Sequence, residues 1–146
     1  MRRREFITLL GGAAALPLAA RAQERDRVRR IGVLMAIPPD DPQSPVRIAA
    51  ITLGLQQLGW TEGHNVRLEY RWPAGDPERT RQYAAELLAL APDVIVSSGA
   101  SVVSVLLQQT RSVPIVFTNL TDPVSAGFVD NLARPGGNAT GFMNFE

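Results

Sequence analysis

The sequence predicts an α/β fold, a doubly wound parallel sheet of about five strands. Residues 94–96 (Val-Ile-Val) form a β-branched apolar run with no polar partner face. Such a run is typical of a strand that is buried on both faces of a parallel sheet. Before and after it, strand-like segments alternate with segments whose apolar residues recur at helical spacing. This alternation predicts the doubly wound sheet, with residues 94–96 in its interior.

Each of the other predicted strands has its own local pattern. Residues 30–35 are apolar around Gly32 and lead into a proline-rich loop. Residues 66–72 alternate between apolar and polar side chains, which is typical of a half-exposed strand at a sheet edge. Residues 114–117 and 138–143 predict the remaining two strands.

The first two predicted helices each begin with a capping residue followed by proline. Ser44 is expected to cap the first helix, with Pro45 at its first position and Gly59 just past its end. Residues 76–77 (Asp-Pro) begin the second helix in the same way, and Pro92 ends it. The residues expected on the buried face of the first helix are Ile48, Ile51, Leu55 and Leu58.

Two further helices are expected in the second half of the chain. Residues 102–109 predict one of them, directly after the small residues 97–101. Asp122 can cap the other, which Pro123 would begin. The buried side of this fourth helix is expected to consist of Val124, Phe128 and Leu132.

The first 22 residues have the three parts of a secretory signal peptide. Residues 2–4 are a basic start, residues 6–20 are an apolar run too short to span a bilayer, and residues 20–22 (Ala-Arg-Ala) fit a cleavage site. Residues 3–7 also resemble the twin-arginine export motif. We therefore expect a signal peptide at 1–22, a tether at 23–29 and a globular lobe at 30–146, exported to the periplasm. No stable membrane span is expected after cleavage; an uncleaved anchor is the alternative.

Composition excludes several kinds of chemistry. The chain has no cysteine, which excludes disulfides, a thiolate nucleophile and cysteine-built metal sites. All 15 basic residues are arginine, so a Schiff-base lysine and the lysine of a nucleotide-binding loop are excluded as well. The single histidine cannot build a multi-histidine metal site. We therefore predict no catalytic residue, no metal and no cofactor.

The charge of the chain lies mainly in its first segment. Residues 1–22 hold four of the 15 arginines and one of the 14 acidic residues, so the rest of the chain carries a net charge of −2. A nucleic-acid partner requires a clustered basic face. This balance therefore predicts no nucleic-acid binding.

Two small polar loops, residues 97–101 and 118–122, follow predicted strands at their carboxyl ends, where ligands bind in open α/β sheets, and residues 35–38 lie at the same edge. A ligand carboxylate could be held by the serine hydroxyls and backbone N–H groups of residues 97–101, at a helix start. Asp122 is a candidate partner for an ammonium group. The alternatives are a plain strand-to-helix turn with a serine cap, and a helix-capping role for Asp122. The predicted ligand-binding residues are Met35, Ala36, Ser97, Ser98, Gly99, Ala100, Ser101, Thr118, Asn119 and Asp122.

Several stretches are similar to those of one known family. They are residues 30–35 (Arg-Ile-Gly-Val-Leu-Met), 58–66 (Leu-Gly-Trp-Thr-Glu-Gly-His-Asn-Val), 70–75 (Tyr-Arg-Trp-Pro-Ala-Gly), 91–96, 114–117 and 122–142, which ends Ala-Arg-Pro-Gly-Gly-Asn-Ala-Thr-Gly-Phe. The chain resembles the substrate-binding proteins of ABC transporters with the type I periplasmic-binding fold. The resemblance is closest to the branch whose known members take aromatic amino acids such as tryptophan.

The resemblance implies a fold of two similar lobes that close on a ligand. This chain has material for the N-terminal lobe only, so the second lobe is expected to be missing. The implied partners are a small amino-acid-like ligand and the permease of an ABC importer. The implied chemistry is recognition without turnover.

Two other interpretations remain open from the sequence. An exported flavodoxin-like enzyme would need a base beside Ser97, Ser98 or Ser101, whereas His64 belongs to a turn before the predicted edge strand. No glycine-rich dinucleotide fingerprint follows the first strand. A truncated reading frame without independent function is the other alternative, which an in-frame continuation downstream would reveal.

Replacing both Arg3 and Arg4 with lysine tests the export route. If the twin-arginine pathway is used, the double variant should fail to be exported, because lysine keeps the charge but loses the recognised guanidinium groups. The folded part of the chain should be unaffected. The fraction of protein in the periplasm measures the outcome, and unchanged export would show that the general secretory route is used.

Overall fold

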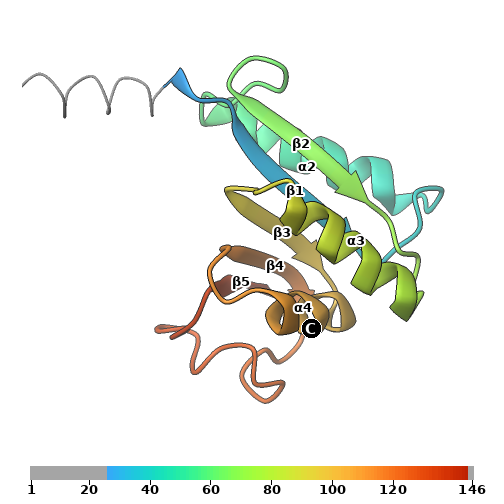
Figure 1. Cartoon of the computed structure of the whole chain (residues 1–146), viewed down its shortest axis with the longest axis vertical. Coiled ribbons are helices and arrows are strands. Elements are labelled where there is room, and N and C mark those ends of the chain that lie inside the picture. The colour runs from blue at the N-terminus through green and yellow to red at the C-terminus, as the bar shows by residue number, and fades with distance from the viewer. Residues whose placement is uncertain (1–25, 145–146) are drawn as a thin grey trace, which may run out of the picture.

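The computed structural model of this chain describes residues 26–144 (Figure 1). The predicted signal peptide and residues 23–25 of the tether lie outside the described residues. The described strands are β1 (Arg29–Met35), β2 (Val66–Arg71), β3 (Val94–Ser98), β4 (Ile115–Leu120) and β5 (Ala139–Met143). The described helices are α2 (Gln43–Gln57), α3 (Pro77–Ala89) and α4 (Ala100–Gln109).

The five strands form one parallel sheet in the order β2-β1-β3-β4-β5. The predicted fold class is therefore confirmed. β3 is central, pairing with β1 on one side and β4 on the other, and β2 is an edge strand, both as predicted. Because all strands run the same way, the ends of β1, β3 and β4 meet at one edge of the sheet.

The helices cover both faces of the sheet, α2 on one and α3 with α4 on the other (Figure 1). On the α2 face, Val33 of β1 packs in a cluster with Ile51 and Leu55. On the opposite face, Ile95 of β3 packs in a cluster with Leu87 and other residues of α3 and α4. Successive strand residues point to opposite faces, so β1 and β3 contribute to both clusters.

Gly32 allows the α3 face to close over β1. A Cβ at this position would lie 3.2 Å from Ile95 Cγ1 and 3.5 Å from both terminal methyls of Leu87. Both neighbours are fully buried, so neither has free space to move into. The missing side chain therefore avoids a tight contact with Ile95, whereas the distance to Leu87 would be ordinary van der Waals packing.

Helix α3 begins as the sequence predicts. The Asp76 side chain accepts a hydrogen bond from the Arg79 backbone N–H at 3.0 Å, and Pro77 is the first helical residue. α2 differs from the prediction at its start, because Pro42 occupies the cap position and Ser44 lies inside the helix. The Ser44 hydroxyl donates instead to the Pro38 carbonyl at 2.7 Å, which secures the preceding loop.

The end of α2 is partly as predicted. Gly59 follows the helix in the left-handed conformation, with φ of +87°, as its C′ position requires. Leu58 was expected on the buried face, and this expectation is wrong: the residue is 78% exposed. Leu58 is the C-cap, where the chain leaves helical geometry and the helical spacing no longer sets the direction of a side chain.

The predicted fourth helix is wrong: residues 121–137 form a series of turns. Gly127 adopts φ of +74°, which interrupts a right-handed helix five residues after Asp122. Phe128 is partly buried against the core, but Val124 is 40% exposed and Leu132 59% exposed. The helical spacing of these three residues therefore does not correspond to one buried face.

The α2 face is open over β4 and β5. Val94 and Val96 of β3 are only partly buried, so the expectation that this strand is covered on both faces is wrong for the α2 side. Val116 is also partly exposed, and Phe142 is 72% exposed. Only the face that carries Ile95 is fully closed.

Substituting Ile95 with aspartate tests the closed side of the sheet. An unpaired carboxylate at this fully buried position should destabilise the chain by more than about 3 kcal/mol. Val46→Asp is the matched control, because Val46 is 67% exposed on α2, and it should change stability by less than about 0.5 kcal/mol. Urea unfolding measures both. Equal stability of the two variants would contradict the position assigned to β3.

Candidate functional site

A cavity of about 310 Å³ lies at the carboxyl ends of the strands, on the α2 face. Its walls come from the end of β1, the inner side of α2, β3, the end of β4 and the residue after β5. The lining residues are Met35, Arg47, Ala50, Ile51, Val96, Thr118, Asn119 and Asn144. One wall is apolar, and the others carry a guanidinium, a hydroxyl and two amides. The cavity can therefore hold a small molecule that is both apolar and polar.

Arg47 brings a positive charge to this cavity. It is the only charged residue of α2, and its side chain is partly buried. Nη1 donates to the Ser98 hydroxyl at 2.9 Å, and Nη2 donates to Oε1 of Gln43 at 2.9 Å. Both acceptors are neutral, so the guanidinium is held in place without neutralisation of its charge.

Two asparagines form the opposite side of the cavity. Asn119 adopts a left-handed φ of +59° where the pairing of β4 with β5 shifts register between Phe117 and Leu120. The Asn144 side-chain amide donates to Oδ1 of Asn119, and the Asn144 backbone N–H donates to the Leu120 carbonyl at 2.9 Å. Left-handed asparagines in irregular strands are common where a site needs a particular side-chain direction.

The structure brings five of the predicted ligand-binding residues together here. Met35, Thr118 and Asn119 line the cavity. Ser98 is buried beside it and accepts the hydrogen bond from Arg47. Ala36 is joined to Ser98 by a backbone hydrogen bond of 3.3 Å, from the Ala36 N–H to the Ser98 carbonyl.

The other residues of the strand-to-helix turn do not line the cavity. Ser97 points to the opposite face, fully buried, and its hydroxyl has no hydrogen-bond partner among residues 26–144. Gly99 occupies the cap position of α4, with φ of +98°, and no side chain caps this helix. Ala100 and Ser101 are exposed in its first turn. The serine-cap alternative is therefore wrong, and a ligand role for these residues stays a prediction.

Asp122 is exposed and lies outside the cavity. Its Oδ1 accepts a hydrogen bond from the Ser125 backbone N–H at 2.9 Å. Hydrogen bonds from the Ser125 side chain and backbone lower the pKa of Asp122 below its ordinary value. Asp122 thus caps a turn in this structure, and its pairing with a ligand ammonium stays a prediction.

Sequence reasoning missed Arg47, Ala50 and Asn144 as site residues, and gave Val96 and Ile51 only structural roles. Arg47 could have been recognised as a candidate site residue, because it is the only charged residue in a helix of fifteen residues. Asn144 lies 25 residues after Asn119, and nothing in the local pattern indicates that they meet.

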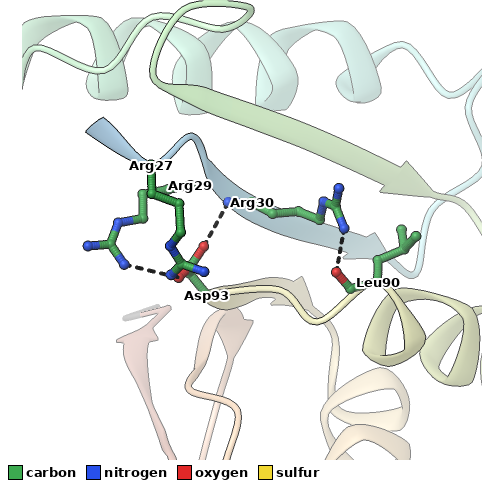
Figure 2. A network of polar contacts seen from close by, with 5 residues as sticks. All are labelled: Arg27, Arg29, Arg30, Leu90 and Asp93. Atoms are coloured by element: carbon green, nitrogen blue, oxygen red, sulfur yellow. Dashed lines mark hydrogen bonds and ion pairs between the residues drawn. The ribbon is translucent and has the colours of Figure 1, made fainter. Parts of the chain in front are cut away.

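A larger cavity, of about 710 Å³, lies at the amino ends of the strands. Figure 2 shows a polar cluster beside it: Arg27 and Arg29 contact the Asp93 carboxylate, and Arg30 Nη1 donates to the Leu90 carbonyl. Asp93 Oδ2 also accepts from the Arg30 backbone N–H at 2.9 Å. This cluster joins the start of β1 to the segment before β3, and its main role is structural.

The pKa of Asp93 follows from these contacts. Partial burial alone would raise it, but the hydrogen bonds from the Arg30 backbone and the Arg29 side chain, with the nearby charges of Arg27 and Arg29, lower the pKa below its ordinary value. The ionised carboxylate is therefore favoured in the folded chain.

The fold places this chain in a class of proteins: lobes built on an open parallel sheet, a fold in which ligands bind beyond the carboxyl ends of the strands. The model of one family, described as ABC transporter substrate binding protein, matches residues 31–146. The chain belongs to this family.

Individual relatives agree with this assignment. A tyrosine-binding protein of Clostridioides difficile (strain R20291) is 29% identical over 91 residues, which are 62% of this chain and 26% of that protein. An ABC domain from Streptococcus pneumonia, solved in complex with L-Trp, is 27% identical with a TM-score of 0.72, over 79% of this chain and 38% of that one. A conserved domain protein from Vibrio cholerae is 31% identical with a TM-score of 0.75. The match covers 82% of this chain and 40% of that one.

The chain therefore spans about a quarter of the curated relative and about two fifths of these solved chains. In the described part, residues 26–144, no helix combines the length and apolarity that crossing a membrane requires.

Asp93→Asn tests the cluster at the amino ends of the strands. The folded-state pKa of Asp93 lies below its unfolded value, so its contribution to stability is present above about pH 4 and is lost as the pH falls through the folded pKa. The variant should be about 1–2 kcal/mol less stable than wild type at pH 7. Urea unfolding of both proteins from pH 7 to pH 2 should show this difference shrinking in acid. A difference independent of pH would contradict the role assigned to the carboxylate.

Proposed function

We propose that this chain is the N-terminal, ligand-binding lobe of an exported substrate-binding protein that serves an ABC importer. It would bind a small amino-acid-like ligand and release it unchanged. Family membership supports the transport role. The observation that carries the proposal is the cavity at the carboxyl ends of the strands, where a fixed guanidinium and two amides face an apolar wall.

The shape of this cavity suits an amino acid with a large apolar side chain. Met35, Ile51 and Val96 provide an apolar surface for that side chain, while Arg47 and the asparagine pair can bind its polar groups. One relative is described as a tyrosine-binding protein, and another was solved with L-Trp. An aromatic amino acid is therefore the ligand class that we propose.

A second lobe would complete the site. This chain spans only about two fifths of the solved chains that it matches. We propose that residues 30–146 form one wall of a cleft and that the missing length supplies the other. Closure of two lobes would remove the ligand from water, which strengthens the polar contacts.

The proposed location of the protein is the periplasm. The interpretation of residues 1–22 as a cleaved signal and 23–29 as a tether would place the lobe outside the inner membrane. There it could deliver ligand to a permease, which is the proposed protein partner.

The positions of the hydroxyl groups favour binding over catalysis. A serine nucleophile needs a base within hydrogen-bond reach. The Ser98 hydroxyl is bonded to Arg47 at 2.9 Å, and Ser97 is fully buried on the other face. His64 is exposed in the turn before β2, at the opposite end of the sheet. An exported enzyme is therefore the weaker candidate.

Calorimetric titration of the full-length protein that carries this sequence tests the proposal. L-Tryptophan and L-tyrosine should bind saturably, and each should be recovered chemically unchanged after long incubation. Glucose, which has no carboxylate, is the control and should not bind. Residues 23–146 alone should bind at least about tenfold more weakly, since the second lobe contributes contacts. Turnover of either amino acid, or no binding of either, would contradict the proposal.

A further inference from the structure

We propose that Arg47 is the anion-binding group of this cavity and that the ligand is bound through a carboxylate on the α2 side of the sheet. This inference rests on the proposed function and extends it, because it assigns the charged end of the ligand to one residue. It assigns the carboxylate to the Arg47 guanidinium beside Ser98, instead of to the backbone N–H groups at the start of α4.

The charge of Arg47 is not compensated within the described part of the chain. Across residues 26–144, no carboxylate forms an ion pair with this guanidinium, although its side chain is partly buried. Arg71, which is partly buried too, pairs with Glu86 at 3.0 Å. Withdrawing a charge from water without a counter-ion is unfavourable. An anionic ligand would supply the missing counter-ion.

Two hydrogen bonds hold the Arg47 guanidinium in place. Gln43 binds it from the same helix and Ser98 binds it from β3, each at 2.9 Å, so its position is fixed by two elements. A guanidinium has more N–H donors than these two bonds use. Its planar arrangement of donors matches a carboxylate. Because Arg47 lines the cavity, we assign its unused donors to a ligand inside it.

The rest of the cavity defines what else the ligand carries. Ile51 and Val96 are apolar neighbours of Arg47 in the lining, and the Asn119–Asn144 amide pair lies across from them. The volume of about 310 Å³ lies at the lower end of the range for small-molecule sites. The ligand class is therefore a small carboxylate with an apolar body and a further polar group.

A purely structural role for Arg47 makes a different prediction. In that case its bond to Ser98 would only hold α2 against β3, and its loss would lower stability without changing ligand preference. Comparing a carboxylate ligand with its neutral amide separates the two roles, because the amide keeps the apolar body and the ammonium but has no negative charge.

The experiment measures L-tryptophan and L-tryptophanamide binding to the full-length protein by calorimetry. Wild type should prefer L-tryptophan by about ten- to a hundredfold. Arg47→Gln should abolish this preference by weakening L-tryptophan binding, with little change for the amide. Arg47→Lys should retain part of the preference, because it keeps the charge but loses the planar donors. Arg81→Gln, on the exposed surface of α3, is the matched control and should behave as wild type.

Each other outcome has a defined meaning. If Arg47→Gln keeps the preference for L-tryptophan, the carboxylate is bound elsewhere; this inference is then wrong while the proposed function stands. If wild type binds neither molecule, both are wrong. If Arg47→Gln does not fold, Arg47→Met decides, because it removes the charge and keeps an unbranched side chain; a preference equal to wild type in that variant would overturn the inference. Thermal melts of every variant establish that each comparison is made between folded proteins.

Discussion

The burial of β3 between β1 and β4 is the interaction on which the rest of the structure depends. Ile95 is fully buried on one face, and the parallel pairing places Met35 beside Ser98 and Ser98 beside Thr118. These three residues come from distant parts of the sequence, yet they end at one edge because parallel strands share a direction. The candidate site therefore depends on how the core packs. A substitution that disrupts the centre of the sheet would also separate the residues of the site.

The charged groups at the two ends of the sheet differ in whether they are paired. At the amino ends, Asp93 is bound by arginines and by a backbone N–H, so the charges of that cluster are used within the fold. At the carboxyl ends, Arg47 is held by two neutral groups and keeps its charge uncompensated. The larger cavity lies at the amino ends, but the smaller one has the chemistry of a binding site. We therefore propose the smaller cavity as the ligand site, although it is not the larger of the two.

The open part of the α2 face fits a chain that spans about two fifths of the solved proteins it matches. Parallel sheets are ordinarily covered on both faces. Here the exposed Phe142 and the partly exposed Val116 lie on a side that α2 does not reach. In the proposed two-lobe arrangement, the second lobe would supply the other wall of the cavity.

The sequence by itself determined the features that depend on neighbouring residues. Periodicity predicted the five strands, with the alternation of residues 66–72 placing β2 at the edge, and the Asp76 cap with Pro77 located the start of α3. The tertiary structure alone decided the rest. Local spacing predicted a helix after Asp122, whereas the left-handed Gly127 and the packing of Phe128 produce turns. Met35, Thr118 and Asn119 could be anticipated in the site because strand ends are visible in the sequence. The partnership of Arg47 with Ser98 could not, because it joins residues 51 positions apart and exists only once α2 lies on β3.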